Sequence, residues 1–168
     1  MAGLLAVGLA VWGGWVALQM LARKEAAAVL ERGRLHFEGA TGLVGRMAGH
    51  ELALPALATR CANCHALGEP GEAGNPVRAG LASSAPATAT ATVLVSAAGA
   101  GVPALGQQGL SSARQRRGGP ASRYDSSSLC RLLALGQDPV HVLISTAMPR
   151  YEIRPEQCQE LWAYLTAK

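Results

Sequence analysis

The longest apolar run of the chain lies at its beginning. Residues 3–22 read GLLAVGLAVWGGWVALQMLA and contain no charged side chain. A helix of this length is about 30 Å long, which matches the hydrocarbon core of a bilayer. The pattern predicts a single transmembrane helix, with residues 1–25 as an N-terminal membrane anchor. A cleavable signal peptide, for which Ala26 to Ala28 offer small residues, and a buried helix remain as alternatives.

Two amphipathic segments frame the rest of the chain. Residues 25–38 are rich in good helix formers, and their apolar stripe consists of Val29, Leu30, Gly33 and Phe37. Pro155 opens a last helix over residues 155–168, whose apolar face consists of Cys158, Leu161, Trp162 and Leu165. Each segment is expected to be a helix with one buried face.

Capping signals predict two more helices before the last one. The three serines at 126–128 can cap a helix that ends at Gly136. Asp138 followed by a proline predicts a second helix, which continues to about Thr146. Met148 then falls on a loop, because it precedes a proline and such residues avoid the α region.

The middle of the chain shows less order. Residues 39–50 are rich in glycine without a clear period, and residues 52–60 allow only a short helical segment. The stretch from about 82 to 115 is of low complexity, with many Ala, Thr and Gly residues, and is expected to be a surface loop.

Composition and charge narrow the functional classes. Aromatic residues make up 4% of the chain, and much of the 49% hydrophobic fraction is alanine. A bound planar cofactor would supply the large apolar surface that such an interior lacks. The formal net charge of +4 is modest, and it gives no reason to expect a nucleic-acid partner.

The strongest chemical signal is a C-x-x-C-H motif, from Cys61 to His65. Two thiols at this spacing can add to the two vinyl groups of one porphyrin, and the adjacent imidazole of His65 can bind the iron. A zinc site would need a second Cys/His pair at short spacing. A thioredoxin-like motif would need a βαβ pattern around it. Neither is visible, so the motif predicts one covalent haem c.

The second axial ligand is less constrained by the sequence. Haem iron in electron-transfer proteins usually has a second ligand, and methionine raises the potential. We favour Met148, because it lies on a loop with a fixed exit direction. Met47, His50 and His141 are the alternatives, and His141 lies on the helix predicted to lead to Met148. His36 and His50 are otherwise expected at the surface.

These residues give the chain a resemblance to class I c-type cytochromes, in particular to membrane-anchored bacterial monohaem ones. The resemblance covers roughly residues 26–168, apart from much of 82–115. It rests on the haem motif, on Met148 and its proline, and on the terminal helices. It implies an all-α, cytochrome c-like helical domain around one haem, preceded by the single transmembrane helix.

The resemblance also implies roles for individual residues. His65 would be the proximal ligand and Met148 the distal ligand, both bound to iron. The carbonyl group of Pro76 would accept the N–H of the proximal histidine. In the terminal helices, the pair Gly33 and Phe37 would be crossed by a C-terminal helix carrying Leu161, Tyr164 and Leu165.

Cys130 and Cys158 remain once the motif has used two of the four cysteines. In an oxidising compartment this even remainder favours a disulfide, although two buried free thiols are the alternative. A bridge would close a loop that contains Met148.

A basic cluster lies between the low-complexity stretch and the first capped helix; it consists of Arg114, Arg116, Arg117 and Arg123. One interpretation is an ordinary solvated loop. The other is a patch that meets haem propionates or an acidic partner.

The location that the resemblance implies conflicts with one charge rule. Arg23 and Lys24 follow the apolar run, and the positive-inside rule would place them in the cytoplasm. Haem attachment in this family takes place on the outer face of the bacterial inner membrane. We give the motif precedence, because the rule is a bias and Glu25 lies among the cations. The expected location is the inner membrane, with residues 3–22 in the lipid bilayer and the haem domain in the periplasm.

We therefore expect the protein to be an electron carrier rather than an enzyme. It would exchange electrons with redox proteins such as a membrane respiratory or dehydrogenase complex. It could equally serve as a haem subunit of an oxidoreductase. The alternatives are a haem enzyme or gas-binding protein with an open distal site, and a structural membrane protein without cofactor.

Overall fold

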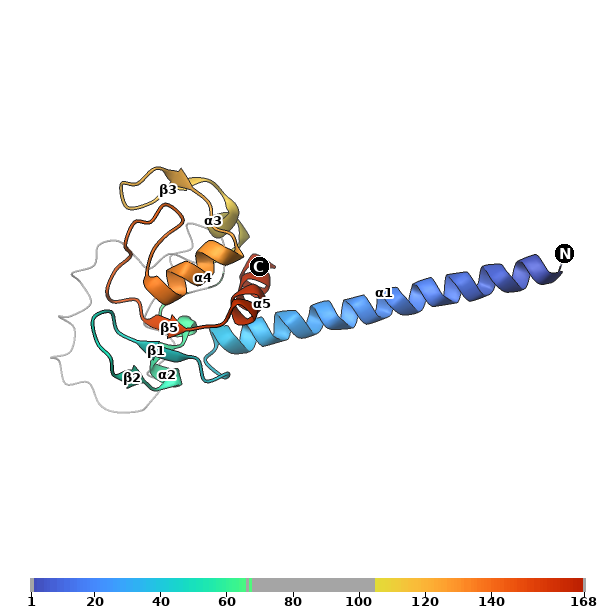
Figure 1. Ribbon diagram of the computed structural model, residues 1–168, viewed down its shortest axis with the longest axis horizontal. Helices are drawn as coiled ribbons and strands as arrows, with labels where there is room; N and C mark the ends of the chain where they lie inside the picture. Colours follow the sequence, from blue (N-terminus) through green and yellow to red (C-terminus); the bar gives the residue numbers. More distant parts are fainter. Residues whose placement is uncertain (1, 66, 68–104, 168) are drawn as a thin grey trace, which may run out of the picture.

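The computed structural model describes residues 2–65, 67 and 105–167, with side chains at residue 12 and from residue 14 onward (Figure 1). Its helices are α1 Ala2–Phe37, α2 Ala56–Thr59, the 3₁₀ helix η1 Cys61–Asn63, α3 Gln107–Ser111, α4 Ser126–Leu135 and α5 Pro155–Thr166. Its strands are β1 Val44–Arg46, β2 Ala53–Leu54, β3 Arg114–Gln115, β4 Ala121–Ser122 and β5 Arg150–Glu152.

The prediction of an all-α fold is wrong, because the helices are combined with two small antiparallel sheets. One sheet has the strand order β2-β1-β5, and the other is the β3-β4 pair. In the first sheet, Gly45 lies opposite Leu54 on one side and opposite Tyr151 on the other. The strands are two or three residues long, which is too short to leave a period-two pattern in the sequence.

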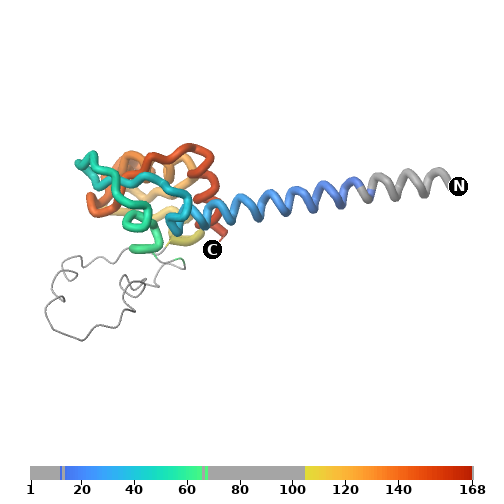
Figure 2. The backbone as a smooth tube through the Cα atoms, turned by 90° about the horizontal axis from the view of Figure 1, so that it is seen from below, coloured from blue at the N-terminus to red at the C-terminus, as the bar shows by residue number. Residues whose placement is uncertain are grey.

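The prediction of a transmembrane helix is also corrected. Among the residues that the structure describes, no helix has both the length and the apolar character needed to cross a bilayer. Instead α1 is one continuous helix through the expected boundary at residue 25, and it projects away from the rest of the chain (Figure 2).

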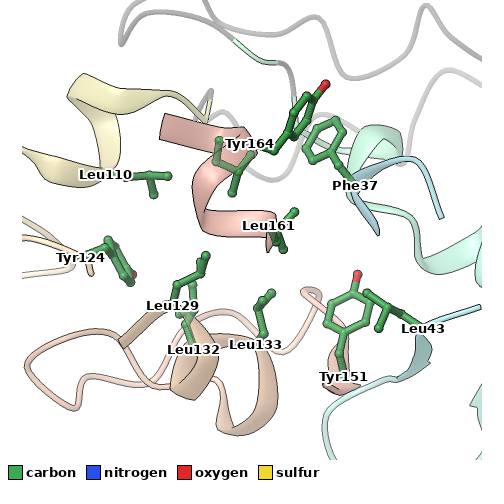
Figure 3. Packing of buried hydrophobic residues seen from close by; sticks show 11 residues of the cluster. Phe37, Leu43, Leu110, Tyr124, Leu129, Leu132, Leu133, Tyr151, Leu161 and Tyr164 are labelled. Atoms are coloured by element: carbon green, nitrogen blue, oxygen red, sulfur yellow. The ribbon is translucent and has the colours of Figure 1, made fainter. Parts of the chain in front are cut away.

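The C-terminal part of α1 crosses α5 at Gly33. A Cβ atom at Gly33 would overlap the carbonyl oxygen of Glu160 and lie 2.6 Å from the Cβ atom of Tyr164. Only glycine therefore lets the two backbones approach this closely. One turn further along α1, the rings of Phe37 and Tyr164 lie 5.9 Å apart between centroids (Figure 3). The helices crossing here are the ones that the sequence resemblance pairs.

A charged cluster stands beside this crossing. Glu160 accepts a hydrogen bond from Nε of Arg32, and its Oε2 lies 2.8 Å from Nε2 of His36. The other ring nitrogen of His36 is 2.8 Å from the hydroxyl oxygen of Thr41. Burial raises the pKa of Glu160, but the contacts with Arg32 and His36 outweigh burial and leave that pKa below its usual value. His36 is buried here, so its expected surface position is wrong.

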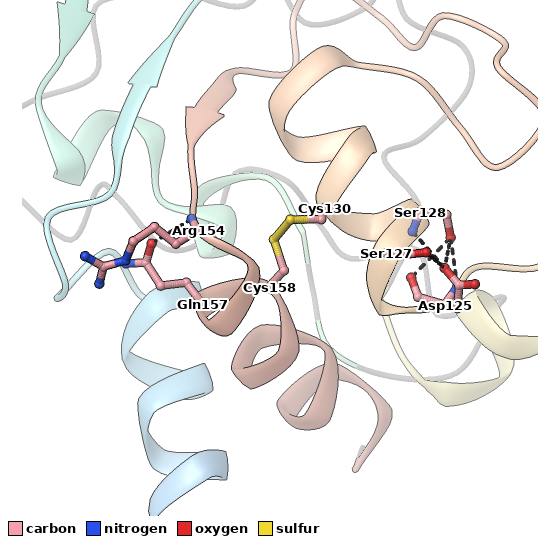
Figure 4. Close-up of a disulfide and its surroundings, with 7 residues drawn as sticks. All are labelled: Asp125, Ser127, Ser128, Cys130, Arg154, Gln157 and Cys158. Carbon is pink, nitrogen blue, oxygen red and sulfur yellow. Dashed lines mark hydrogen bonds between the residues drawn. A yellow bond between two sulfur atoms is a disulfide. The ribbon is translucent and has the colours of Figure 1, made fainter.

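The disulfide between Cys130 and Cys158 joins α4 to α5 (Figure 4). The two Cα atoms are 5.4 Å apart, and the closed loop spans a sequence separation of 28. By loop entropy, such a bridge is worth about 3–4 kcal/mol. The loop contains Met148, so the bridge limits how far that residue can move from α5.

The N-terminus of α4 is held by a capping box. Oδ1 of Asp125 accepts the backbone N–H of Ser128 at 2.7 Å, and the hydroxyl oxygen of Ser128 accepts the backbone N–H of Asp125 at 2.9 Å (Figure 4). Hydrogen bonds from Ser128, and a further one from Ser127, lower the pKa of Asp125 to about 2. The serines predicted to cap this helix thus share the task with an aspartate.

Replacing Asp125 with alanine should lower the free energy of unfolding by about 1 kcal/mol at neutral pH. Because the folded-state pKa lies below the ordinary value near 4, this stabilisation is present above about pH 4 and is lost as the pH falls toward 2. Denaturant unfolding of Asp125→Ala and the parent at several pH values measures it. Ser127→Ala, which removes one hydrogen bond to the same carboxylate, is the milder control. A parent–variant difference unchanged at the lowest pH would contradict this assignment.

The helix predicted from Asp138 to Thr146 does not form. The buried carboxylate of Asp138 instead accepts the backbone N–H groups of Val140 at 3.0 Å and Val142 at 2.8 Å. His141 has a φ of 64°, a left-handed conformation that a right-handed helix excludes. The predicted N-cap is therefore wrong, and the side chain of Asp138 closes a turn instead of opening a helix.

The hydrophobic core lies between α1, α4, α5 and β5 (Figure 3). Its most deeply buried residues include Leu133, Leu161 and Leu165, all at most 3% exposed. Half-buried residues near the C-x-x-C-H motif and from the loop before β5 pack against this cluster. They are Cys61, Ala62, Leu67, Leu105, Ile144 and Met148. The haem motif and the methionine loop therefore border the same core.

Candidate haem attachment site

The C-x-x-C-H motif is a single tight turn. Cys61 begins η1, and its carbonyl oxygen accepts the backbone N–H groups of Cys64 at 3.1 Å and of His65 at 2.9 Å. This turn keeps both thiols and the imidazole on a few consecutive residues of fixed backbone. Attachment through two thiols and ligation by the next side chain need this closeness.

The side chain of Asn63, inside the motif, fastens the turn to α2. Its amide nitrogen donates to the carbonyl oxygens of Leu57 at 2.8 Å and Ala58 at 3.2 Å. Its amide oxygen accepts a hydrogen bond from Nε of Arg60. The two residues between the cysteines are thus not interchangeable spacers, because Asn63 orients the turn.

The two motif cysteines have different surroundings. Cys61 is half-buried against the core, whereas Cys64 is exposed. Burial raises the pKa of the Cys61 thiol to about 11, although a hydrogen bond with Tyr151 partly opposes this shift. Neither thiol is in a disulfide, since Cys130 and Cys158 pair with each other. Both motif thiols are therefore available for thioether bonds, which is the donor set that a covalent haem requires.

Strand β5 connects the motif to the methionine loop. The hydroxyl group of Tyr151 donates to the carbonyl oxygen of Thr59, two residues before the motif. Burial raises the pKa of Tyr151, and the neighbouring thiol of Cys61 raises it further. Gly45 of β1, the cross-strand neighbour of Tyr151, also lies against Thr59, and a Cβ atom there would come within 2.8 Å of the threonine side chain.

Met148 lies two residues before the start of β5, on a loop as expected. It is half-buried and packs against the core that Cys61 and Ala62 also contact. Its backbone N–H donates to the carbonyl oxygen of Ser145 at 3.2 Å, which closes a short turn. The structure thus places this methionine and the haem motif on the same core, although they are far apart in the sequence.

The alternative axial ligands lie elsewhere. Met47 and His50 belong to the turn between β1 and β2, where the N–H of His50 donates to the carbonyl oxygen of Met47 at 3.0 Å. His50 and His141 are exposed. His141 is not on a helix, contrary to the prediction. Pro76, the predicted partner of the proximal histidine, lies outside the described residues, as does most of the low-complexity stretch.

Leu67 and Leu105 form an isolated parallel bridge, so these two residues lie side by side although they are far apart in the sequence. Within the described part of the chain, no group of three or more His, Cys, Asp or Glu side chains could hold a metal ion.

The basic cluster divides into one structural and three exposed arginines. Arg116 donates to the carbonyl oxygens of Ser122 and Gly109 and lies 4.9 Å from the ring centre of Tyr124. It therefore holds the β3-β4 hairpin together. Arg114, Arg117 and Arg123 are exposed.

Sequence reasoning missed Tyr151 and Arg150, which support the site from β5. The only signal for them is their position directly after Met148 and its proline. Comparisons of the chain with protein-family profiles, curated proteins and solved structures find no match. The functional argument therefore depends on the residues of this chain.

Proposed function

We propose that the protein is an electron carrier with one covalent haem c, attached through Cys61 and Cys64 and ligated by His65 and Met148. One observation carries the proposal. The two free thiols of the chain lie on one fixed turn, directly before a histidine, and that turn packs on the same core as the methionine loop. Haem, when bound, would supply a reversible one-electron couple.

The chain's own residues would hold, orient and shield that group. Asn63 orients the turn, and Tyr151 fixes its position relative to β5. The apolar core beside Cys61 and Met148 would exclude water from one side of the site, and a sulfur ligand raises the potential. The disulfide restrains the methionine loop from its far end.

The proposed location is the periplasm, and the proposed partners are other redox proteins. Covalent haem attachment and a disulfide between α4 and α5 both suit an oxidising compartment. With both axial positions filled, the iron would bind no substrate. Electrons would then pass only at the haem edge, to or from a dehydrogenase, an oxidase or another cytochrome.

An absorption spectrum of the ferrous holoprotein with and without carbon monoxide tests this function. A carrier with His/Met ligation should be low-spin and leave the gas unbound. Immediate binding of carbon monoxide would contradict the proposal and favour a haem enzyme or gas-binding protein with an open distal site. A His65→Ala variant, which lacks the proximal ligand, is the positive control for an accessible iron.

A further inference from the structure

The turn that ends at Met148 is held by a side chain that follows it. Nη1 of Arg150 donates to the carbonyl oxygen of Met148 at 2.6 Å, and Nη2 lies 3.4 Å from the carbonyl oxygen of Ser145. Ser145 is the first and Met148 the last residue of this turn, which a hydrogen bond from the N–H of Met148 to the carbonyl oxygen of Ser145 closes at 3.2 Å. One guanidinium thus spans both ends of the turn, as only a forked donor can.

The fold leaves a specific space for this guanidinium. Gly136, the left-handed residue that ends α4, has a φ of 70°. A Cβ atom at this position would overlap the guanidinium of Arg150. The carbonyl oxygen of Gly136 in turn accepts the N–H of Ile144 at 2.9 Å, so the same glycine anchors the loop that leads to Met148.

Ion pairing does not explain Arg150. Its cross-strand neighbour on β1 is Arg46, and like charges opposite each other destabilise a sheet. Arg46 pairs with Glu152 instead. Among the described residues, Arg150 has no ion pair with a carboxylate, and its guanidinium donates instead to the two carbonyl oxygens of the methionine turn.

We propose that Arg150 is a positioning residue, which fixes the turn 145–148 so that the sulfur of Met148 is presented to the iron. This inference rests on the proposed function. A weak iron–sulfur bond persists when the loop that carries the sulfur has little freedom to leave. Arg150 supplies that restraint near the ligand, whereas the disulfide supplies it from a distance.

The test compares Arg150→Gln, Arg150→Lys and the parent as ferrous holoproteins mixed with carbon monoxide. Loss of the bridging hydrogen bonds should raise the rate of gas binding about tenfold and weaken the far-red absorption band of the methionine-ligated ferric form. Arg150→Lys, which keeps the charge but not the fork, should behave like Arg150→Gln. Arg46→Gln removes a neighbouring charge from the same sheet and should match the parent.

Hydrogen exchange of the full chain measures the turn itself. The amide of Met148 should exchange about tenfold faster in Arg150→Gln, while amides of α5 stay protected as in the parent. Suppose that the parent leaves carbon monoxide unbound and that its Arg150 variants keep both the gas-binding rate and the amide protection of the parent. This result would overturn the positioning role of Arg150 but not ligation by Met148. A parent that binds carbon monoxide at once would overturn ligation by Met148, and the positioning role with it.

Discussion

Replacing Met148 with leucine is expected to lower the midpoint potential of the holoprotein and to open the iron to carbon monoxide. Leucine has nearly the volume of methionine, so the core beside Cys61 should be kept at a cost below about 1.5 kcal/mol. The sulfur that we propose as the distal ligand, however, is lost. Because axial ligands shift haem potentials over about 0.8 V, a fall on the order of 0.1 V or more is expected.

Redox titration and the spectrum with carbon monoxide measure these effects. The matched control is Met47→Leu, which makes the same chemical change in the β1-β2 turn and should leave both readouts at the parent values. If Met148→Leu kept its potential and its optical bands, the assignment of the distal ligand would be wrong. A response of Met47→Leu instead would move the ligand to the β1-β2 turn.

The second large effect is expected from Gly33→Val. Its side chain would meet the backbone of Glu160 and the Cβ atom of Tyr164, neither of which can move without shifting α5. Overpacking of this kind costs about 3 kcal/mol. Because α5 also carries one end of the disulfide and much of the core, the whole domain should unfold at a lower denaturant concentration.

Gly14→Ala is the control within the same helix. A Cβ atom at Gly14 meets nothing within 4 Å, so this change should be neutral or slightly stabilising through helix propensity. Denaturant unfolding followed by circular dichroism compares the two variants. Equal midpoints for Gly33→Val and the parent would refute the close crossing of α1 and α5.

Part of the crossing was predictable from the residues themselves, because a glycine on an apolar helical stripe marks a close approach. Its partner, the C-terminal helix, was expected only from the resemblance to c-type cytochromes. Cys130 and Cys158 were similarly constrained, since the motif leaves only these two cysteines to pair. Such features can be recognised in a sequence because one or two residues are enough to define each of them.

The sheets and the chain that leads to the turn of Met148 could not be predicted in the same way. Strand β1 is three residues long and includes Gly45, whose role becomes visible only when Thr59 is placed beside it. Asp138 was wrongly predicted to cap a helix, because the choice between a helix and a turn depends on tertiary contacts. For Arg150, the decisive partners are backbone carbonyl groups, which leave no trace in the pattern of side chains.

The apolar run at the N-terminus shows a different limit of prediction from sequence. Its length and lack of charge suggested a bilayer span, whereas the structure gives one continuous helix in which Trp12, Trp15 and Leu18 are exposed. Hydrophobicity alone does not state what an apolar helix contacts. The haem motif depends on spacing rather than on hydrophobicity, and its interpretation does not change with that of the helix.

The most direct measurement is a haem stain of the chain on a denaturing gel, after expression together with the c-type maturation machinery. The parent should carry haem through denaturation, because thioether bonds are covalent, and Cys130→Ser/Cys158→Ser should stain as well. Cys61→Ser/Cys64→Ser should not stain. A parent without stain, or a Cys61→Ser/Cys64→Ser variant that stains like the parent, would contradict covalent attachment at this motif.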